Sequence, residues 1–381
     1  MHPLSNKAAI VGIGASPQGK VPGSTSLSLA VEAFKRAIAE CGLKKEQIDG
    51  LLSMPGTTSP EGAWNYLRLG ETLGINPRFT GSMMLGGATA GALVHQAAMA
   101  VTNGLATYVA CVFGDAAATG GFRFDRTSGW GDSWDIWGYM SAAANSAITA
   151  SRHMALYGTK STQLAEIAVA CRRHASLNPD ATMRKPITIE EHQASRWVVQ
   201  PLHLLDCCLI SDGGVCLIVT TAERAKDLPH PPVLISGIGQ CYTTQNMERE
   251  DWWYAPHQKN AVDDAYAMAG VGPKDIDVAQ LYDNFTISAL LWLEHGGFCK
   301  KGEAGAFVEG GRVQLGGDLP INTHGGNLSD SYMEGWLHLA EGVRQIRGQC
   351  GARQVEGAEV CLVTGRGRPL NNANATILTR G

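Results

Sequence analysis

Short apolar runs alternate with segments of helical periodicity through the first 114 residues of the chain. Three runs have the length and composition of buried strands: residues 8–15, 48–54 and 107–113. The segments between them favour helices: residues 26–41, 59–73 and 86–104. Strands that alternate with helices in this way predict α/β layers.

Residues 320–348 combine a polar, glycine-containing turn with another helical pattern. Its apolar positions follow steps of four, three, four and three: Tyr332, Trp336, Leu339, Val343 and Ile346. Ser331 and Glu334 have the spacing of a capping box, and Gly348 is placed to end the helix. A helix that starts in such a turn offers N–H groups and a positive dipole end to an anionic oxygen. The stretch therefore predicts a helix with a candidate site at its start.

The pattern of the first 114 residues starts again after residue 229. Landmarks recur in the same order: Gly12 as Gly237, Ile48-Asp49 as Ile276-Asp277, Gly86-Gly87 as Gly325-Gly326, and Gly114 as Gly365. Such recurrence indicates an internal duplication of a βαβ-type half. We expect one half over residues 1–228 and the other over 229–381, joined at the proline-rich segment 229–232.

Residues 115–200 interrupt this rhythm and predict an insertion in the first half. A glycine- and aromatic-rich piece, residues 122–139, precedes two helical segments near 141–157 and 162–177. An insertion of this length suggests a lid or a dimer-facing subdomain. The aromatic side chains, Trp130 and Trp134 among them, could line a broad apolar pocket or equally form part of a dimer core.

The composition narrows the classes of protein and partner. The hydrophobic share of 44% and the charged share of 17% are those of a globular protein. A net charge of −4 does not indicate nucleic acid or an anionic membrane as a partner. The start of the chain lacks the layout of a signal peptide, and no window approaches 18 unbroken apolar residues. We therefore expect a cytoplasmic protein.

The sequence gives little indication of a metal site or a dinucleotide-binding site. The ten cysteines form no C-x-x-C pair, which suits reduced, buried thiols better than disulfides or a zinc site. The histidines show no ligand spacing with one another. Gly12-x-Gly14 is a fragment of a dinucleotide fingerprint that lacks the third glycine and a suitable acid. No cofactor is expected.

The turn in residues 320–348 resembles the catalytic loop of thiolases in the sterol carrier protein branch. That loop reads roughly Asn-x-x-Gly-Gly-x-x-x-x-Gly-His-Pro, and Asn322, Gly325 and Gly326 match it. The resemblance covers essentially the whole chain. It implies the thiolase fold, a five-layer α-β-α-β-α arrangement of two duplicated halves. The Gly-His position of the loop, however, is Ser331-Tyr332 in this chain.

Other catalytic groups of thiolases are also replaced. The nucleophilic cysteine should fall at or beside Gly87, and no residue from 81 to 91 is a cysteine. The second cysteine should fall within residues 363–367, where none stands, and Cys361 is better interpreted as a strand residue. The family's Asn-Glu-Ala-Phe turn appears as residues 282–285, with Tyr282 in place of the asparagine. These departures argue against acyl transfer through a cysteine.

Paired tyrosines in these two turns are similar to a subgroup, the lipid-transfer-protein-type retro-aldolases of bacterial steroid side-chain degradation. The resemblance implies a carbon–carbon lyase that cleaves a tertiary β-hydroxyacyl-CoA to a ketone and a shorter acyl-CoA such as propionyl-CoA. It also implies a homodimer core, paired through the strand near residues 107–113. A small OB-fold partner of the DUF35 type would complete a heterotetramer, and zinc would occur only in that partner.

The reaction distributes roles among the candidate residues. Tyr282 or Tyr332 would remove the proton of the β-hydroxyl, and the other tyrosine would protonate the enolate carbon, provided that neighbours lower a phenol pKa from about 10. His324 and the N–H groups around Gly325 and Gly326 would hold the enolate oxygen. Asp283 would orient Tyr282 or a water. The substrate-binding candidates are Gly325, Gly326, Asn322, Gly87, Trp130 and Trp134.

Alternatives remain at this point. Each tyrosine could be a buried aromatic residue hydrogen-bonded at a strand end, and His324 a structural residue of a turn. The chain could also be an acyltransferase with an atypical nucleophile, which a trapped acyl adduct would reveal. A non-catalytic acyl-CoA-binding subunit is the third possibility.

The lyase hypothesis makes a prediction about the cysteines. Because none aligns with the thiolase nucleophile, alkylation with iodoacetamide under native conditions should leave the activity largely intact. Mass spectrometry would identify the modified thiols, and the release of shorter acyl-CoA would measure the activity. A loss of activity that follows the modification of one cysteine would contradict the lyase assignment.

Overall fold

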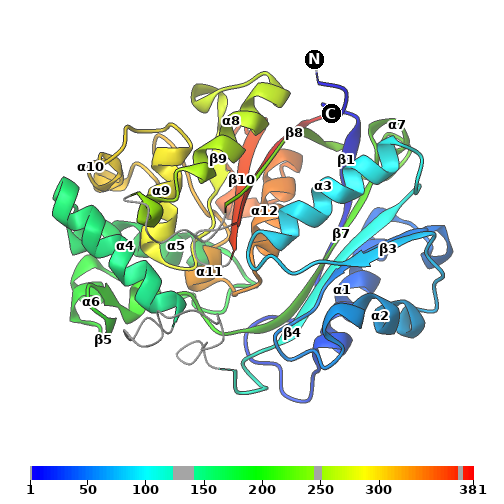
Figure 1. Cartoon of the computed structure of the whole chain (residues 1–381), viewed down its shortest axis with the longest axis horizontal. Coiled ribbons are helices and arrows are strands. Elements are labelled where there is room, and N and C mark those ends of the chain that lie inside the picture. The colour runs from blue at the N-terminus through cyan, green and yellow to red at the C-terminus, as the bar shows by residue number, and fades with distance from the viewer. Residues whose placement is uncertain (1, 123–140, 244–250, 368–371) are drawn as a thin grey trace.

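The computed structural model describes residues 2–122, 141–243, 251–367 and 372–381 (Figure 1). Nine strands form one sheet, which consists of two similar parts. The part built from the first half has the order β3-β2-β4-β7-β1. Its strands are β1 (Ala8–Ala15), β2 (Gly50–Met54), β3 (Phe79–Ser82), β4 (Val109–Ala116) and β7 (Asp212–Thr221).

The part built from the second half repeats this topology. Its strands run in the order β8-β11-β10-β9: β8 (Val233–Tyr242), β9 (Val278–Gln280), β10 (Val360–Gly367) and β11 (Asn372–Arg380). In the first half the pairs β3-β2 and β2-β4 are parallel, and in the second half the pair β9-β10 is parallel; the pairs that follow in each half are antiparallel. Ile321 bridges Ala279 in parallel, at the position where β3 pairs with β2 in the first half. The topology confirms the duplication.

Helices complete five layers. Helices α1 (Ser26–Cys41) and α2 (Asn65–Leu73) cover the outer face of the first part of the sheet. Helices α3 (Thr89–Thr102) and α12 (Trp336–Arg347) lie between the two parts and share one apolar core with both. Helices α8 (His257–Ala269) and α9 (Thr286–His295) pack on the outer face of the second part. The predicted α-β-α-β-α arrangement is confirmed (Figure 1).

The insertion between β4 and β7 packs on the second half. It contains α4 (Ala142–Tyr157), α5 (Ser161–Leu177), α6 (Ile189–Ala194), β5 (Trp197–Val199) and β6 (Leu202–His203). Its Leu164 and Ile167 belong to the same core as Leu290 of α9 and Leu328 of α11 (Gly326–Ser329). The short helices α7 (Ala222–Ala225) and α10 (Ala304–Phe307) complete the fold. Within the described residues, no helix is long and apolar enough to cross a membrane.

Two details of the sequence prediction are wrong. Helix α12 begins at Trp336, after Gly335, so Ser331 and Glu334 do not form a capping box. The backbone takes a left-handed turn there, with φ of 48° at Glu334 and 83° at Gly335. The run 107–113 also cannot pair across a dimer, because β4 already lies between β2 and β7. Among the described residues, the end strands of the nine-stranded sheet are β3 and β9; Ile321 bridges the outer side of β9, whereas the outer edge of β3 is unpaired.

The glycine pairs that open both halves serve helix packing. A Cβ atom on Gly14 would lie 2.0 Å from the carbonyl oxygen of Ala33 in α1, and one on Gly239 would lie 1.7 Å from that of Ala261 in α8. Only glycine lets these helix backbones approach the strands so closely. This explains Gly12-x-Gly14 and its repeat without a nucleotide.

Substitution of Gly239 by alanine should therefore destabilise the protein. Neither backbone can move aside easily, so we expect a loss of about 1–3 kcal/mol or more in the free energy of unfolding. Gly70→Ala is the matched control, because a Cβ atom there meets nothing nearer than 3.7 Å. That helical substitution should stabilise the protein by about 0.4–1 kcal/mol. Chemical denaturation of both variants measures the difference, and equal effects would refute this account.

Candidate active site

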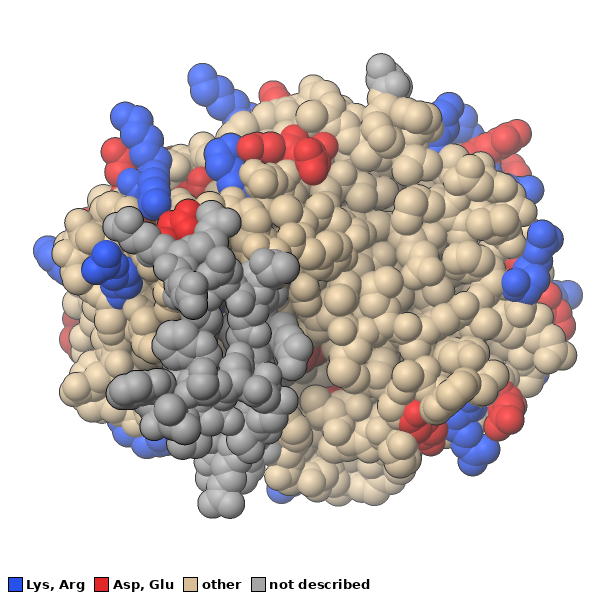
Figure 2. All heavy atoms as spheres, in the orientation of Figure 1, with Lys and Arg blue, Asp and Glu red and all other residues tan. Residues whose placement is uncertain are grey.

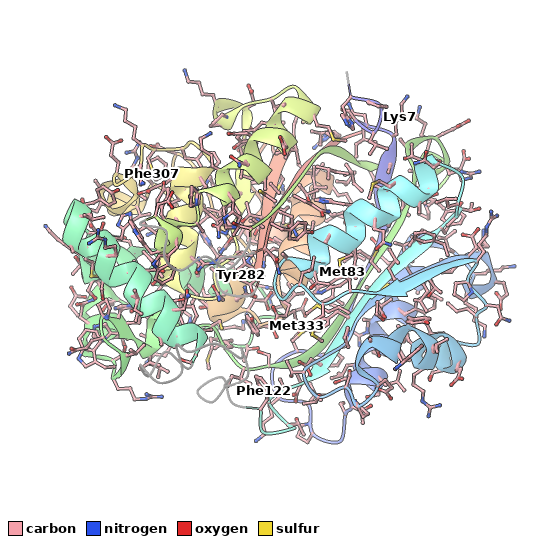
Figure 3. All side chains as sticks on the ribbon, viewed as in Figure 1. Lys7, Met83, Phe122, Tyr282, Phe307 and Met333 are labelled. Atoms are coloured by element: carbon pink, nitrogen blue, oxygen red, sulfur yellow. The ribbon has the colours of Figure 1, made fainter. Side chains whose placement is uncertain are left out.

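A cavity of about 530 Å³ lies where the two halves and the insertion meet. Figure 3 shows Tyr282, one of its wall residues, at the centre of the molecule. The first half contributes the loop before α3, with Gly86 and Gly87, and the carboxyl end of β4. The remaining wall includes Asn145 of α4 and the turns that carry Tyr282 and Tyr332.

The structure brings the two predicted tyrosines together. Their phenolic oxygens are 3.1 Å apart, so one hydroxyl donates a hydrogen bond to the other. The turn of Tyr282 follows β9 and is fixed by a hydrogen bond from its backbone N–H to Thr364 Oγ1, at 3.0 Å. The backbone N–H of Tyr332 donates to Ser211 Oγ at 3.1 Å. Both phenols are thus anchored through their own main chain.

Gly87 and Tyr282 are sterically coupled. A Cβ atom on Gly87 would lie 2.0–2.2 Å from the ring and hydroxyl of Tyr282. Real Cβ atoms do not come so close to other heavy atoms, so no side chain at position 87 is compatible with this placement of the tyrosine. The glycine at the position expected for a nucleophile is therefore a steric requirement of Tyr282.

Sequence reasoning missed the role of Glu334 in this site. Glu334 lines the cavity, and the hydroxyl of Tyr282 donates to its Oε2 at 3.2 Å. Burial raises the pKa of the Glu334 carboxyl to about 7, although hydrogen bonds from Tyr332 and Tyr282 partly counteract that effect. In the sequence, Gly335 was the signal that the helix starts later and leaves Glu334 in a turn. In the structure this glycine has a positive φ.

The same surroundings raise the pKa of both phenols, whereas the sequence analysis required neighbours that lower it. Burial, together with the charge of Glu334, raises the pKa of Tyr282 and of Tyr332 well above 10. A phenol with a pKa of 10 is ionised only about once in a thousand molecules at pH 7. Both hydroxyls are therefore protonated hydrogen-bond donors at neutral pH.

Asp283 and His324 lie behind the cavity. Neither is among the described residues that line the cavity. Asp283 Oδ1 accepts from the backbone N–H of Asn327 at 2.8 Å and lies 3.0 Å from His338 Nε2. His324 Nδ1 lies 2.8 Å from Asp330 Oδ2. Neither residue contacts a tyrosine hydroxyl in these hydrogen bonds.

The predicted turn residues support the site from a distance. The amide group of Asn322 accepts from the backbone N–H of Leu281 at 2.7 Å and donates to its carbonyl at 2.8 Å. Asn322 therefore fixes the chain just before Tyr282. Gly325 and Gly326 lie in the same turn and are not in the described wall, whereas Gly87 is. Trp130 and Trp134 lie outside the described residues.

Other polar side chains are found among the described residues that line the cavity. Arg366 of β10 is 4% exposed and donates to Ser288 Oγ at 3.2 Å. Asn284 and Asn372 add amides. All ten cysteines are described and none lines the cavity; burial raises the pKa of Cys361, which lies in β10 as expected. The described residues contain no group of three or more histidine, cysteine or acidic side chains arranged for a metal ion.

Comparisons with known proteins agree with this geometry. Residues 239–380 match the family model of the thiolase C-terminal domain-like group. The chain is 39% identical to the steroid side-chain-cleaving aldolase of Thermomonospora curvata, with 97% of each chain covered. It is 40% identical to the 17-hydroxy-3-oxo-4-pregnene-20-carboxyl-CoA lyase of Mycobacterium tuberculosis, over 96% of this chain and 98% of that one.

A solved structure extends the likeness to three dimensions. The Ltp2–ChsH2(DUF35) aldolase superposes with a TM-score of 0.90 at 38% identity, covering 99% of this chain and 98% of that one. Identity at this level over nearly full length goes beyond a shared fold. The chain belongs to the thiolase-fold family of steroid side-chain-cleaving aldolases.

Proposed function

We propose that this protein is a retro-aldol carbon–carbon lyase that cleaves a tertiary β-hydroxyacyl-CoA of the steroid side-chain type. The products would be a ketone and a shorter acyl-CoA such as propionyl-CoA. The observation that carries the proposal is the hydrogen-bonded pair of Tyr282 and Tyr332 in a cavity without a cysteine. The names of the two relatives, a side-chain-cleaving aldolase and an acyl-CoA lyase, support the same reaction.

The reaction moves one proton and breaks one carbon–carbon bond. The β-hydroxyl loses its proton, a carbonyl forms at Cβ, and the electron pair of the Cα–Cβ bond passes to Cα as a thioester enolate. A proton then adds to Cα and completes the shorter acyl-CoA. Two hydroxyls 3.1 Å apart suit this exchange, because one can accept a proton while the other donates.

The enolate oxygen needs donors that are in place before the bond breaks. The sequence assigned this task to His324 and the turn around Gly325, which lie outside the described wall. Arg366 and Asn284 do lie in the wall, and a buried guanidinium is the stronger donor to a negative oxygen. We therefore assign the enolate oxygen to Arg366.

The cavity suits an apolar acyl group. Its volume of about 530 Å³ falls within the range of about 300–1,000 Å³ that is common for small-molecule sites. Apolar side chains line much of it: Met54, Met84, Leu85 and Phe113. The nucleotide end of a CoA thioester would extend out of such a cavity toward solvent.

We also propose that two copies of the chain pair and that each binds a DUF35 partner. The unpaired edge of β3 exposes backbone groups that a second copy can pair with, so a homodimer through β3 is favoured over one through β4. The related Ltp2–ChsH2(DUF35) aldolase names a DUF35 component, which supports a DUF35 partner here. Added to the proposed homodimer core, one such partner per chain would give a heterotetramer. Figure 2 shows basic and acidic side chains interspersed around the described part of one face, without a patch of either sign.

Removal of either phenolic hydroxyl tests the reaction. Tyr282→Phe and Tyr332→Phe keep the ring and delete the acid–base group, so each should lower kcat by about 10²–10⁴-fold. Their combined effect should be less than additive, since the pair acts as a unit. Tyr266→Phe is the control: its hydroxyl donates to the Gly296 carbonyl at 3.0 Å, away from the cavity. Folded Tyr282→Phe and Tyr332→Phe proteins with near wild-type rates would refute the proposal.

A proline in β3 tests the dimer. The backbone N–H groups of Phe79 and Met83 point to β2, so that of Thr80 points away from it, toward the open edge. Thr80→Pro should therefore leave the backbone ladder with β2 intact and block a second copy. Because it also removes the hydroxyl that donates to the Leu51 carbonyl at 2.9 Å, the control is Thr80→Ala, which loses the same hydroxyl and keeps the N–H. Sedimentation at micromolar concentration should show dimers for wild type and Thr80→Ala and monomers for Thr80→Pro. A monomeric wild type would contradict the assembly.

A further inference from the structure

Two of the described residues in the cavity wall carry carboxylates, Asp115 and Glu334. Asp115 is saturated by hydrogen bonds. Its Oδ2 accepts from the backbone N–H and hydroxyl of Thr57 at 2.9 and 2.6 Å. Its Oδ1 accepts from the same two groups of Thr58 at 3.2 and 2.8 Å. Asp115 therefore holds the loop that carries Thr57 and Thr58, and its oxygens are occupied by these hydrogen bonds.

Glu334 differs in its partners. The hydroxyl of Tyr282 donates to Glu334 Oε2 at 3.2 Å, and the hydroxyl of Tyr332 in turn donates to the Tyr282 oxygen at 3.1 Å, so the two groups assigned to proton transfer form one chain that ends at the carboxylate. Because hydrogen bonds link this carboxylate to both phenols, a proton that the substrate releases to the phenols can pass on to it. The geometry thus connects one ionisable acid to the reacting groups through hydrogen bonds.

The backbone at Glu334 indicates that this position is constrained. Its φ of 48° lies in the left-handed region, which glutamate rarely adopts. Such conformations cost on the order of 1–3 kcal/mol, persist where the surroundings fix them, and cluster at functional sites. Here the turn places the Glu334 side chain in the wall of the cavity and lets α12 begin two residues later.

The acid strengths decide which group can take a proton. Both tyrosines have a raised pKa and stay protonated at neutral pH, so neither is ready to act as a base alone. A carboxyl whose pKa is about 7 is half ionised at pH 7, which is the favourable value for a general base. The phenols can relay a proton, but they need an acceptor behind them.

We infer that Glu334 is the proton acceptor of the retro-aldol step, with Tyr282 as the relay. The O–H bond of the substrate breaks as its proton passes to the Tyr282 oxygen, while the Tyr282 proton passes to Glu334 Oε2. Tyr332 then protonates Cα of the enolate and regains a proton from Glu334, directly or through Tyr282. The carboxylate is regenerated in each turnover. This inference rests on the proposed function.

The pH dependence follows from the groups that face Glu334. These are Tyr282 after β9, Tyr332 in the same loop, Asp115 of β4 and Cys208 before β7, with Arg366 of β10 in the same wall. The active form of Glu334 is ionised. The value of kcat/KM should therefore rise with pH through about 7 and then level off.

The test compares Glu334→Gln with Glu334→Asp in the presence of the DUF35 partner. Glutamine can still accept the tyrosine hydrogen bonds but takes no proton, so kcat/KM should fall by about 10²–10⁴-fold and lose its rise near pH 7. Aspartate should retain more activity and a rise with pH. Glu356→Gln, the same change at an exposed position, should match wild type. A folded Glu334→Gln enzyme with an unchanged pH profile would overturn the inference.

A second measurement does not depend on the substrate. Infrared difference spectra of the resting protein between acidic and alkaline pH should contain a carboxyl band that titrates near neutrality. That band should be absent from Glu334→Gln and present in Glu356→Gln. Its absence from wild type would overturn the role of Glu334. A normal band with no cleavage of any β-hydroxyacyl-CoA would instead refute the proposed function.

Discussion

The steric exclusion between Gly87 and the ring of Tyr282 determines what chemistry this fold can perform here. The ring occupies the space that a side chain at the start of the central helix would need. A nucleophile at position 87 and a phenol at position 282 are therefore alternatives, and the chain contains the phenol. Once the phenol is present, Tyr332 and Glu334 complete a hydrogen-bonded group with it, to which we assign the proton transfers of the proposed cleavage.

The duplicated fold is what brings this group together. The turn after β9 carries Tyr282, and the loop before α12 carries Tyr332 and Glu334, so the second half supplies the side chains that we propose for proton transfer. The first half supplies Gly87 and the saturated carboxylate of Asp115. The segments that precede α3 and α12, the equivalent helices of the two halves, both reach this cavity through Gly87 and Glu334, and the two helices share one apolar core.

Sequence patterns predicted the repeat, the layers and the convergence of the tyrosines, because each rests on local periodicity or on motif spacing. Glu334 was misinterpreted because its spacing from Ser331 fits a capping box, and only the tertiary contacts force its left-handed backbone. His324 and Asp283 were expected in the cavity because they adjoin the tyrosines in sequence, yet successive side chains in these turns point in different directions. The prediction that residues 107–113 pair across a dimer was wrong because apolar content does not distinguish an interior strand from an edge strand.

The short ladder between β1 and β8 has a consequence for how the molecule unfolds. Only two residue pairs, Ala9 with Leu234 and Ile10 with Val233, join the backbones of the two parts of the sheet there. The halves are held instead by the apolar layer around α3 and α12, which includes the stacked rings of Phe113 and Trp336. Neither half can keep its inner face dry without the other. The two repeats are thus one cooperative unit in the thermodynamic sense, although the sequence presents them as two copies.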